Sequence, residues 1–519
     1  MVIVPLAITT YNGNSLAVKI VLRGKRPNNI KAQPNRGEEV KNCFCPFPID
    51  PGGVAIPHPA TGGEGSTMSA SDCVLIHVDA FAARSVFRNA TAASANFRGG
   101  LTIEVFLNCP ERPMLPTALF VTSLPGIDFT NNPPRVVCAV EDLILIRVPL
   151  GESDDYFIYR PGGKNGPSLK LLPRPRHIFF DQDVGLLRRG EEHYTIAAFI
   201  AGKPRIYQLH SFDSATQKWS IVHAPLVERQ VSFPYKRIPR NSERLLFHLT
   251  STVIPIGGKG GTMGWVDLWY GILLCDVLSR EPKLRGVPLP LPLDHLRHNN
   301  GLGADLGCPM SLRGITVIAS PGIEPCLKFV ELGVSASPII HDEDSDDEDS
   351  DDDEDWEMHE WTITTWSNSK MTPSWKDWHK DRELKASCTT ISSKLNSKML
   401  KSGLLSPERA FQNLLVSNPA LGIDGDIVYL QARVKFMDPK VFVLGLDTRD
   451  NKLLGAVEFA TERTRGAEVW YFPSNISKYV DPEARDAPIP KASSIYAVSL
   501  DFMTCDEDDP NWEESSQYE

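Results

Sequence analysis

Short β-like runs of apolar and polar residues, separated by turn residues, dominate the chain between residues 71 and 480. Residues 194–200, 205–212 and 217–222 are three such runs, joined by the turn sequences Ala-Gly-Lys-Pro and Asp-Ser-Ala-Thr. Short runs of this kind bounded by turn residues favour strands, so they predict a three-stranded meander. Comparable runs recur within residues 247–332 and 360–459. The pattern predicts a mostly β body.

The length of this body limits which β architectures it can form. Its roughly 410 residues exceed a single sandwich, whereas blades of about 40 to 50 residues would fit a propeller of six to eight blades. No clean repeat recurs from one blade to the next. We therefore expect a degenerate β-propeller-like body with few helices, and two consecutive β domains are the alternative.

One segment carries the signals of a helix. Ser406 suits the N-cap, Pro407 the first helical position and Glu408 the first turn. Asn418 and Pro419 would end the helix. The sequence thus predicts a helix over residues 406–415, with its apolar positions packed on the sheets.

Local amino-acid composition distinguishes three segments from this body: a head, an acidic insertion and a tail. Residues 51–66 hold five glycines and three prolines, which indicates a linker. We expect a poorly ordered, basic, Gly/Pro-rich head over residues 1–70. Residues 342–357 carry thirteen carboxylates and no basic residue, which indicates a disordered acidic insertion over 341–357 in a body of residues 71–480. Residues 481–519 form an acidic tail.

The net charge of −11 comes from 54 basic and 65 acidic residues. The acidic insertion accounts for the excess, so the remaining chain is nearly neutral and offers no broad basic face for nucleic acid. Residues 19–41 are locally basic, which leaves RNA binding through the head as a weaker alternative to a solvated tail. We do not expect nucleic acid as the partner.

Ten cysteines are scattered without a C-x-x-C pair, which favours reduced thiols and an intracellular, cytoplasmic or nuclear location. The apolar opening lacks a charged n-region and a cleavage site, and no apolar run approaches the eighteen or so residues of a membrane-spanning helix. We therefore expect neither a signal peptide nor contact with a membrane.

The sequence does not match the known catalytic and ligand-binding motifs considered below. The glycine loop 257–261 lacks the Ser or Thr and the following helix of a phosphate-binding loop. His295, His298 and Cys308 would need a further zinc ligand. H-E-x-x-H and G-x-S-x-G are absent from the sequence. We assign no catalytic residue and expect neither a metal nor a cofactor.

Two further features suggest packing and regulation. Trp361 and Trp366 would face opposite sides of one strand, which favours packing between layers over an exposed binding aromatic. Ser345 and Ser350 each have acidic residues three positions on, the pattern that acidophilic kinases prefer. We predict phosphorylation of both serines, which would strengthen attraction to a basic partner; a merely solubilising loop is the alternative.

The segment GWVDLWYGILLCDVL at 264–278, followed by LRGVPLPLP at 284–292, resembles the plant family catalogued as domain of unknown function 1618, which is expanded in grasses. The resemblance extends over residues 71–480 through further family-like sequences, RNATAASA at 88–95, EHYTIAA at 192–198 and WTITTW at 361–366. The family pattern is densest at about residues 264–400. We interpret its hallmark as a folding signature, formed by Trp265, Asp267, Leu268, Trp269, Gly271, Cys275 and Asp276.

The resemblance implies no activity, but its layout is similar to the F-box-associated β-propeller proteins of plants. Our leading hypothesis is a non-catalytic interaction scaffold or adaptor for an unknown protein partner of basic character. The alternative is a hydrolase-type enzyme with its site in a propeller funnel, where several blades converge without a linear motif.

Overall fold

The computed structural model describes the chain in parts, which fall into two units, residues 1–49 and 50–519. In the first unit, β1 (Ala7–Asn12) and β2 (Ser15–Ile20) form an antiparallel hairpin. The second unit, called the body below, contains all other described elements. The described residues are 7–12, 15–20, 73–82, 89–96, 100–109, 117–124, 129, 132–150, 153–163, 166–201, 206–229, 248–290, 308–319, 324–338, 356–435, 440–460 and 470–480.

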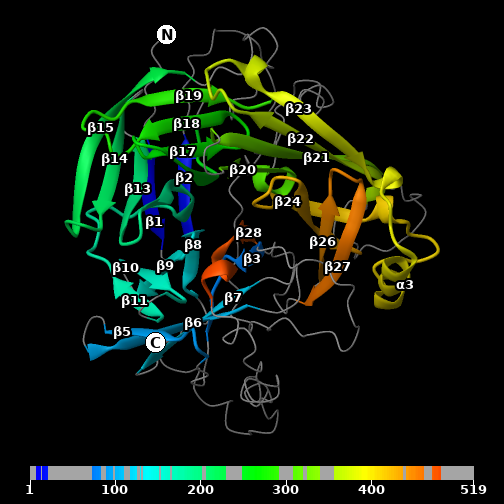
Figure 1. Ribbon diagram of the computed structural model, residues 1–519, viewed down its shortest axis with the longest axis horizontal. Coiled ribbons are helices and arrows are strands. Elements are labelled where there is room, and N and C mark those ends of the chain that lie inside the picture. The colour runs from blue at the N-terminus through cyan, green and yellow to red at the C-terminus, as the bar shows by residue number, and fades with distance from the viewer. Residues whose placement is uncertain are drawn as a thin grey trace, which may run out of the picture. The chain divides into compact units, whose positions relative to one another are not determined.

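The body is built from antiparallel meanders of four strands, as the arrows of Figure 1 show for β20 to β23. Five such meanders follow one another between residues 135 and 460. Their strands are β8 (Arg135–Val140), β9 (Leu143–Leu150), β10 (Ser153–Arg160) and β11 (Ser168–Leu171); β12 (Val184–Arg189), β13 (His193–Ala201), β14 (Ile206–Asp213) and β15 (Lys218–Glu228); β16 (Thr252–Gly257), β17 (Thr262–Asp267), β18 (Gly271–Asp276) and β19 (Leu284–Pro288); β20 (Arg313–Ile318), β21 (Cys326–Pro338), β22 (Trp356–Asn368) and β23 (His379–Lys385); and β24 (Leu415–Leu421), β25 (Ile427–Arg433), β26 (Lys440–Asp447) and β27 (Lys452–Ala460).

A further sheet, the first along the chain, has the strand order β4-β7-β6-β5, so the five meanders are the second to the sixth sheets. It is joined to the two ends of the body, because β3 pairs with the C-terminal strand β28 while Ile76 of β3 bridges Thr117 next to β7. Pairing between the first and last strands ties the beginning of the body to its end. The strands are β3 (Val74–His77), β4 (Phe81–Ala82), β5 (Ala93–Asn96), β6 (Thr102–Asn108), β7 (Ala118–Leu124) and β28 (Tyr471–Ser474).

Consecutive sheets pack face to face through separate apolar clusters. One cluster joins the β4–β7 sheet to the β8–β11 sheet, and others join each later sheet to the next. A further cluster brings Tyr429 and Val443 of the last meander against Leu75 of β3. The first strands of neighbouring meanders also lie beside one another, β8 by β12, β12 by β16, and β20 by β24. The described part of the body is therefore β-propeller-like, with six four-stranded units that are called sheets here.

The second and third meanders, which are the third and fourth sheets along the chain, are linked more closely than the others. Their outer strands β15 and β19 pair in parallel, so the two meanders form one eight-stranded sheet. Its first strand β12 also lies against its last strand β16, which nearly closes the sheet into a barrel. Trp265 fills the interior together with Phe199, at a ring centroid distance of 4.0 Å.

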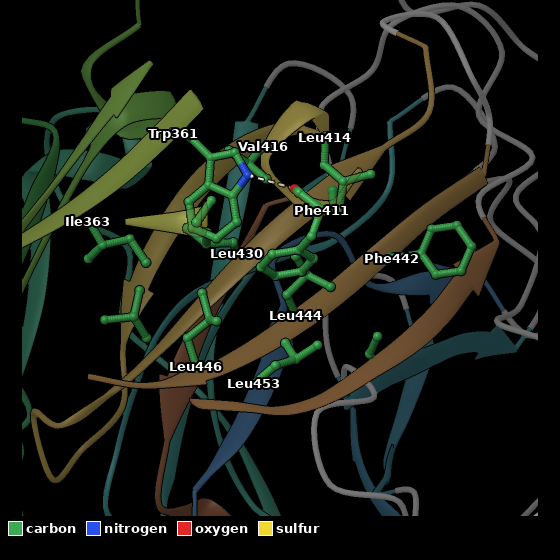
Figure 2. Packing of buried hydrophobic residues seen from close by; sticks show 14 of the residues in the cluster. Trp361, Ile363, Phe411, Leu414, Val416, Leu430, Phe442, Leu444, Leu446 and Leu453 are labelled. Atoms are coloured by element: carbon green, nitrogen blue, oxygen red, sulfur yellow. Dashed lines mark hydrogen bonds between the residues drawn. The ribbon is translucent and has the colours of Figure 1, made fainter. Parts of the chain in front are cut away.

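Figure 2 shows the cluster between the fifth and sixth sheets. Trp361 lies fully buried at its centre, and its Nε1 donates a hydrogen bond to the main-chain oxygen of Phe411 at 3.1 Å. Trp366, on the opposite face of β22, packs partly buried in the cluster between the fourth and fifth sheets. Both rings thus lie between layers, as the alternation along the strand predicts.

The mostly β, propeller-like fold class predicted from the sequence is confirmed, but the predicted helix over residues 406–415 is wrong. Ser406 and Arg409 close a tight turn, residues 411–413 form a short 3-10 helix, and β24 starts at Leu415. Asn418 adopts a φ of 54° in a bulge of β24 and does not end a helix. The capping residues are suited equally to a turn, and tertiary packing of Phe411 and Leu414 decides the outcome.

The longest described helix lies immediately before this turn. α3 (Ser393–Ser402) begins after Ser392, whose Oγ accepts a hydrogen bond from the Leu395 main-chain NH, and ends at Gly403 with a φ of 80°. A left-handed residue at the C-terminal end is typical of helices that stop at glycine. The other described α-helix is the single turn α2 (Pro309–Leu312).

Candidate functional site

The starts of β8, β12, β16 and β20 meet at one edge of the body, called the strand-start edge below. Arg135 opens β8 and pairs with Asp181, just before β12. The Asp183 carboxyl receives a hydrogen bond from Thr250, just before β16. An even number of strands returns the chain to the same edge before each new sheet, so these starts gather there.

The turn between β17 and β18 lies at the same edge. Asp267 accepts a hydrogen bond from the main-chain NH of Leu249, ahead of β16, at 2.7 Å. Arg313, the first residue of β20, donates to the main-chain oxygen of Leu268 at 2.9 Å. The hallmark turn therefore connects the fourth sheet to the fifth.

The connection of residues 172–183, called the anchored loop below, crosses this edge between β11 and β12. Leu172 and Phe179 are buried, and Phe179 packs on Trp219 and against the edge of His210. Trp219 also donates its Nε1 hydrogen to the main-chain oxygen of Pro173 at 2.7 Å. Apolar burial and a hydrogen bond thus fix the middle and the beginning of the loop.

Ion pairs fix both ends of the loop. Arg174 Nε lies 2.6 Å from Oδ1 of the buried Asp155. Arg147 binds Asp181 with two nitrogens, at 2.6 and 3.0 Å, and this planar pairing defines the orientation of the carboxylate. Burial alone would lower the pKa of Arg147, but the neighbouring carboxylates of Asp181 and Asp154 raise it, so the guanidinium stays charged. The loop is held by charge as well as by packing.

Two apolar side chains of this fixed loop nevertheless point to solvent. Ile178 is 77% exposed and Phe180 is 53% exposed. Leu249, which adjoins Thr250 and so lies near Asp183, is 47% exposed. Large exposed apolar residues held by a rigid frame are typical of an interaction surface.

Asp183 is the described carboxyl with a strongly raised pKa. Burial raises its pKa to about 6, and the Thr250 hydroxyl partly opposes the rise. Thr250 Oγ1 also lies 3.4 Å from Nε2 of His248. The carboxyl therefore contacts the hydroxyl and not the imidazole, which differs from the order of a nucleophile-base-acid triad.

The predicted hallmark residues lie together in β17, β18 and the turn between them. Trp265, Leu268, Trp269 and Cys275 are buried, and burial raises the pKa of the Cys275 thiol to about 12. Asp267 accepts hydrogen bonds from the main-chain NH groups of Trp269 and Tyr270, while Gly271 adopts a φ of 150°. Asp276 accepts a hydrogen bond from the Thr262 hydroxyl and not from a turn NH.

Arg313 joins these hallmark residues although the sequence pattern did not single it out. Its guanidinium is fully buried, lies 4.7 Å from the centroid of Trp269, and pairs with Glu331. Phe329 lies at 5.3 Å on the same group. A buried guanidinium between aromatic rings contributes both charge pairing and stacking to the junction of two sheets.

Several predicted sites lie outside the described residues. These are Ser345 and Ser350 in the acidic insertion, the histidine pair His295 and His298, and most of the basic segment 19–41. Within the described part of the chain, no group of three His, Cys, Asp or Glu side chains is arranged to hold a metal ion. The described helices include none long and apolar enough to cross a membrane.

Sequence reasoning missed Ile178, Phe180, Leu249 and the arginine-aspartate network. A signal was present in the connection PRPRHIFF at 173–180, where apolar residues follow prolines and arginines outside any strand pattern. That signal could not separate Phe179, which is buried, from its exposed neighbours. Only the three-dimensional packing of the loop on Trp219 makes the distinction.

Comparison with known proteins supports the resemblance and adds no activity. Residues 265–429 match the model of the family described as protein of unknown function (DUF1618), which supports the predicted resemblance over this region. No curated protein matches the chain. The matched region begins at Trp265 and covers the turn, Arg313 and Trp361.

Solved structures give weak similarities. A hypothetical selenium-binding protein from Sulfolobus tokodaii is 11% identical over 63% of this chain and 78% of its own, with a TM-score of 0.26. The tail fiber of Staphylococcus aureus phage P68 is 10% identical over 71% of this chain and 83% of its own, with a TM-score of 0.17. Neither similarity supports a functional argument.

Proposed function

Since the chain carries a region of the DUF1618 family, whose description names no activity, we propose from the site itself that the body is a non-catalytic protein-interaction scaffold. The partner binds at the strand-start edge. The observation that carries the proposal is the anchored loop, which presents Ile178 and Phe180 to solvent from a frame of buried aromatics and ion pairs.

The fixed frame matters because binding normally costs conformational entropy. Ordering a flexible loop and its side chains opposes association, whereas a loop that is already fixed avoids most of this cost. Apolar anchors surrounded by polar groups are typical of the residues that dominate binding energy. The partner is expected to offer an apolar pocket for Ile178 and Phe180, with polar groups around it.

The test is capture of partners by the full chain and by the double variant Ile178→Ser/Phe180→Ser. We expect proteins that bind the native chain reproducibly to be lost from the double variant. Leu278→Ser is the matched control, because Leu278 is also an exposed apolar side chain, at 39%, but lies in the turn after β18 away from the strand starts. Equal capture by both variants would refute the proposed surface.

We propose further that the acidic insertion attracts a basic partner, and that phosphorylation of Ser345 and Ser350 strengthens this attraction. Each phosphate would add a charge of roughly −1.5 to −2. Phosphopeptide mass spectrometry of the protein isolated from its native tissue tests the modification. Finding both serines unmodified would remove it.

Asp183 supports a second candidate function, hydrolysis at the strand-start edge. A carboxyl with a pKa of about 6 suits proton transfer near neutral pH. A screen with simple ester, phosphate and glycoside substrates tests this alternative. Activity that follows a pKa near 6 and disappears in Asp183→Asn would establish an enzyme and overturn the non-catalytic proposal; no activity above the Asp183→Asn level would remove the candidate.

A further inference from the structure

A buried histidine packs against the anchored loop. His210, in the middle of β14, is only 2% exposed. The ring of His177 lies nearly perpendicular to it, at a centroid distance of 4.9 Å and an angle of 80°. The ring of Phe179 lies 5.3 Å from His210. Because both neighbours belong to the anchored loop, the loop helps to exclude water from His210.

The Nε2 atom of His210 is buried and has no hydrogen-bond partner in the described part of the chain. A neutral imidazole can leave this atom as an unpaired acceptor, whereas protonation turns both ring nitrogens into donors. A buried charged donor without an acceptor is costly, so the closed loop favours the neutral ring. In agreement, burial and the nearby His177 lower the pKa of His210 below its ordinary value of 6.5.

The described strands around His210 bring no carboxylate to the ring. Its cross-strand partners are Ala198 of β13 and Ile221 of β15, and His223 follows two positions further along the same face of β15. Tyr156 of β10 belongs to the cluster that packs on this face, and burial raises its pKa, so it stays neutral. A proton on His210 therefore gains no ion pair from these strands.

The other charged groups of the loop do not compensate such a proton either. Two ion pairs use the charges at its ends, Arg174 with Asp155 and Arg147 with Asp181. Arg176, next to His177 in the sequence, is exposed. Burial raises the pKa of Asp183, after the loop, to about 6, so a fall in pH favours the buried form of this carboxyl and stabilises that end. Asp183 thus acts in the opposite direction to His210.

We propose that protonation of His210 releases the anchored loop from β14 and β15. The loop closes over a neutral imidazole and opens when the ring takes up a proton, because opening lets water hydrate the charged ring. Mildly acidic pH would then weaken binding of the partner to Ile178 and Phe180. Loop release needs no partner, whereas this effect on binding rests on the proposed function.

Limited trypsin digestion at pH 7.5 and at pH 5.5 measures loop opening, because proteolysis follows the open population when opening is fast relative to cleavage. The rate of cleavage after Arg176 is divided at each pH by the rate for a free peptide of residues 171–183, which removes the pH dependence of trypsin itself. We expect the normalised rate of the native protein to rise several-fold at pH 5.5. The rise is at most about tenfold, since this pH lies about one unit below the ordinary pKa of 6.5. An unchanged normalised rate would overturn the proposal.

His210→Gln removes the titrating group and keeps a polar side chain. The rise at pH 5.5 should disappear in this variant, whereas the effect of Asp183 is present in both proteins and cancels from the comparison. His223→Gln is the matched control, since His223 lies on the same face of β15 but is exposed, and it should keep the native rise. Equal rises in His210→Gln and the native protein would overturn the proposal.

A second measurement uses the native protein alone, so it stands whether or not the variant folds. Deuterium exchange at the imidazole C2 position, followed by mass spectrometry, gives the titration of His210. We expect a midpoint below pH 6.5, and a midpoint at or above this value would overturn the proposal. Equal partner capture at both pH values, together with the expected cleavage, would refute the binding surface and not loop release, so the two proposals fail separately.

Discussion

The hallmark turn and the anchored loop lie at the same edge of the body and use their aromatic residues in opposite ways. In the turn, Trp265 and Trp269 are buried, and Trp265 Nε1 donates to the main-chain oxygen of Asp183. In the loop, Phe179 is buried while Phe180 is exposed. Both tryptophans of the hallmark are enclosed by the protein and Tyr270 of the turn is partly buried, whereas the loop uses one ring for anchoring and presents the next to solvent.

We interpret this difference as the separation of a folding signature from the proposed binding surface. The residues that make the family recognisable form junctions between sheets, and their replacement should change stability first. The exposed residues of the loop contribute little buried area, and their replacement should change binding first. The following predictions test that separation, from the largest expected effect to the smallest.

Trp265→Ala should have the largest effect on stability. The substitution removes a fully buried ring from the eight-stranded sheet and the hydrogen bond to Asp183. Loss of a buried tryptophan costs about 3–5 kcal/mol. Chemical denaturation followed by fluorescence would measure the change. An unfolding free energy within about 0.5 kcal/mol of the native value would contradict the structural role of the hallmark.

Arg313→Ala should destabilise the junction of the fourth and fifth sheets by about 3 kcal/mol, because it leaves Glu331 and the oxygen of Leu268 without their partner. The matched control is Arg449→Ala, since Arg449 also pairs with carboxylates but is about half exposed. The control should leave the denaturation midpoint unchanged, because exposed ion pairs contribute little to stability. Equal effects of both substitutions on the denaturation midpoint would show that burial of Arg313 is unimportant.

Asp183→Asn should change how stability depends on pH. The folded-state pKa of about 6 lies above the ordinary value of 3.8, so the native protein loses stability as pH rises between these values. A shift of about two units corresponds to roughly 3 kcal/mol at most, and partial exposure reduces it. The variant should therefore be more stable than the native protein at pH 7.5 and not at pH 3.5, in urea titrations at both values. A gain in the stability of the variant at pH 3.5 only would contradict the raised pKa of Asp183.

Arg147→Ala should loosen the anchored loop with a smaller effect on the whole body. The substitution removes two nitrogens that bind Asp181 and leaves only the pair with Arg135 among the described contacts, so the loop opens more often. Limited trypsin digestion should then cut faster after Arg176, while Arg449→Ala leaves this rate unchanged. Unchanged cleavage in Arg147→Ala would contradict a role of the Arg147–Asp181 pair in fixing the loop.

The alternation of apolar and polar residues was sufficient to predict the strands and the propeller-like class, because period-two patterns report directly on half-buried strands. It was insufficient at residues 406–415, where Ser406 and Pro407 suit a helix start and a turn equally well. The family hallmark could be recognised from Trp265 and Trp269 because its residues are adjacent in sequence. The candidate site could not be recognised in this way, because it combines Arg147 of β9 with Asp181 and Leu249 from two separate connections between strands.

The most direct test of the account measures affinity and stability on the same pair of variants. The dissociation constant of a captured partner and the unfolding midpoint are determined for Ile178→Ser/Phe180→Ser and for Leu278→Ser. We predict at least tenfold weaker binding in the double variant, equivalent to about 1.4 kcal/mol, with an unchanged midpoint and native affinity in the control. Native affinity in the double variant, or a loss of affinity matched by the control, would contradict the assignment of binding to the anchored loop.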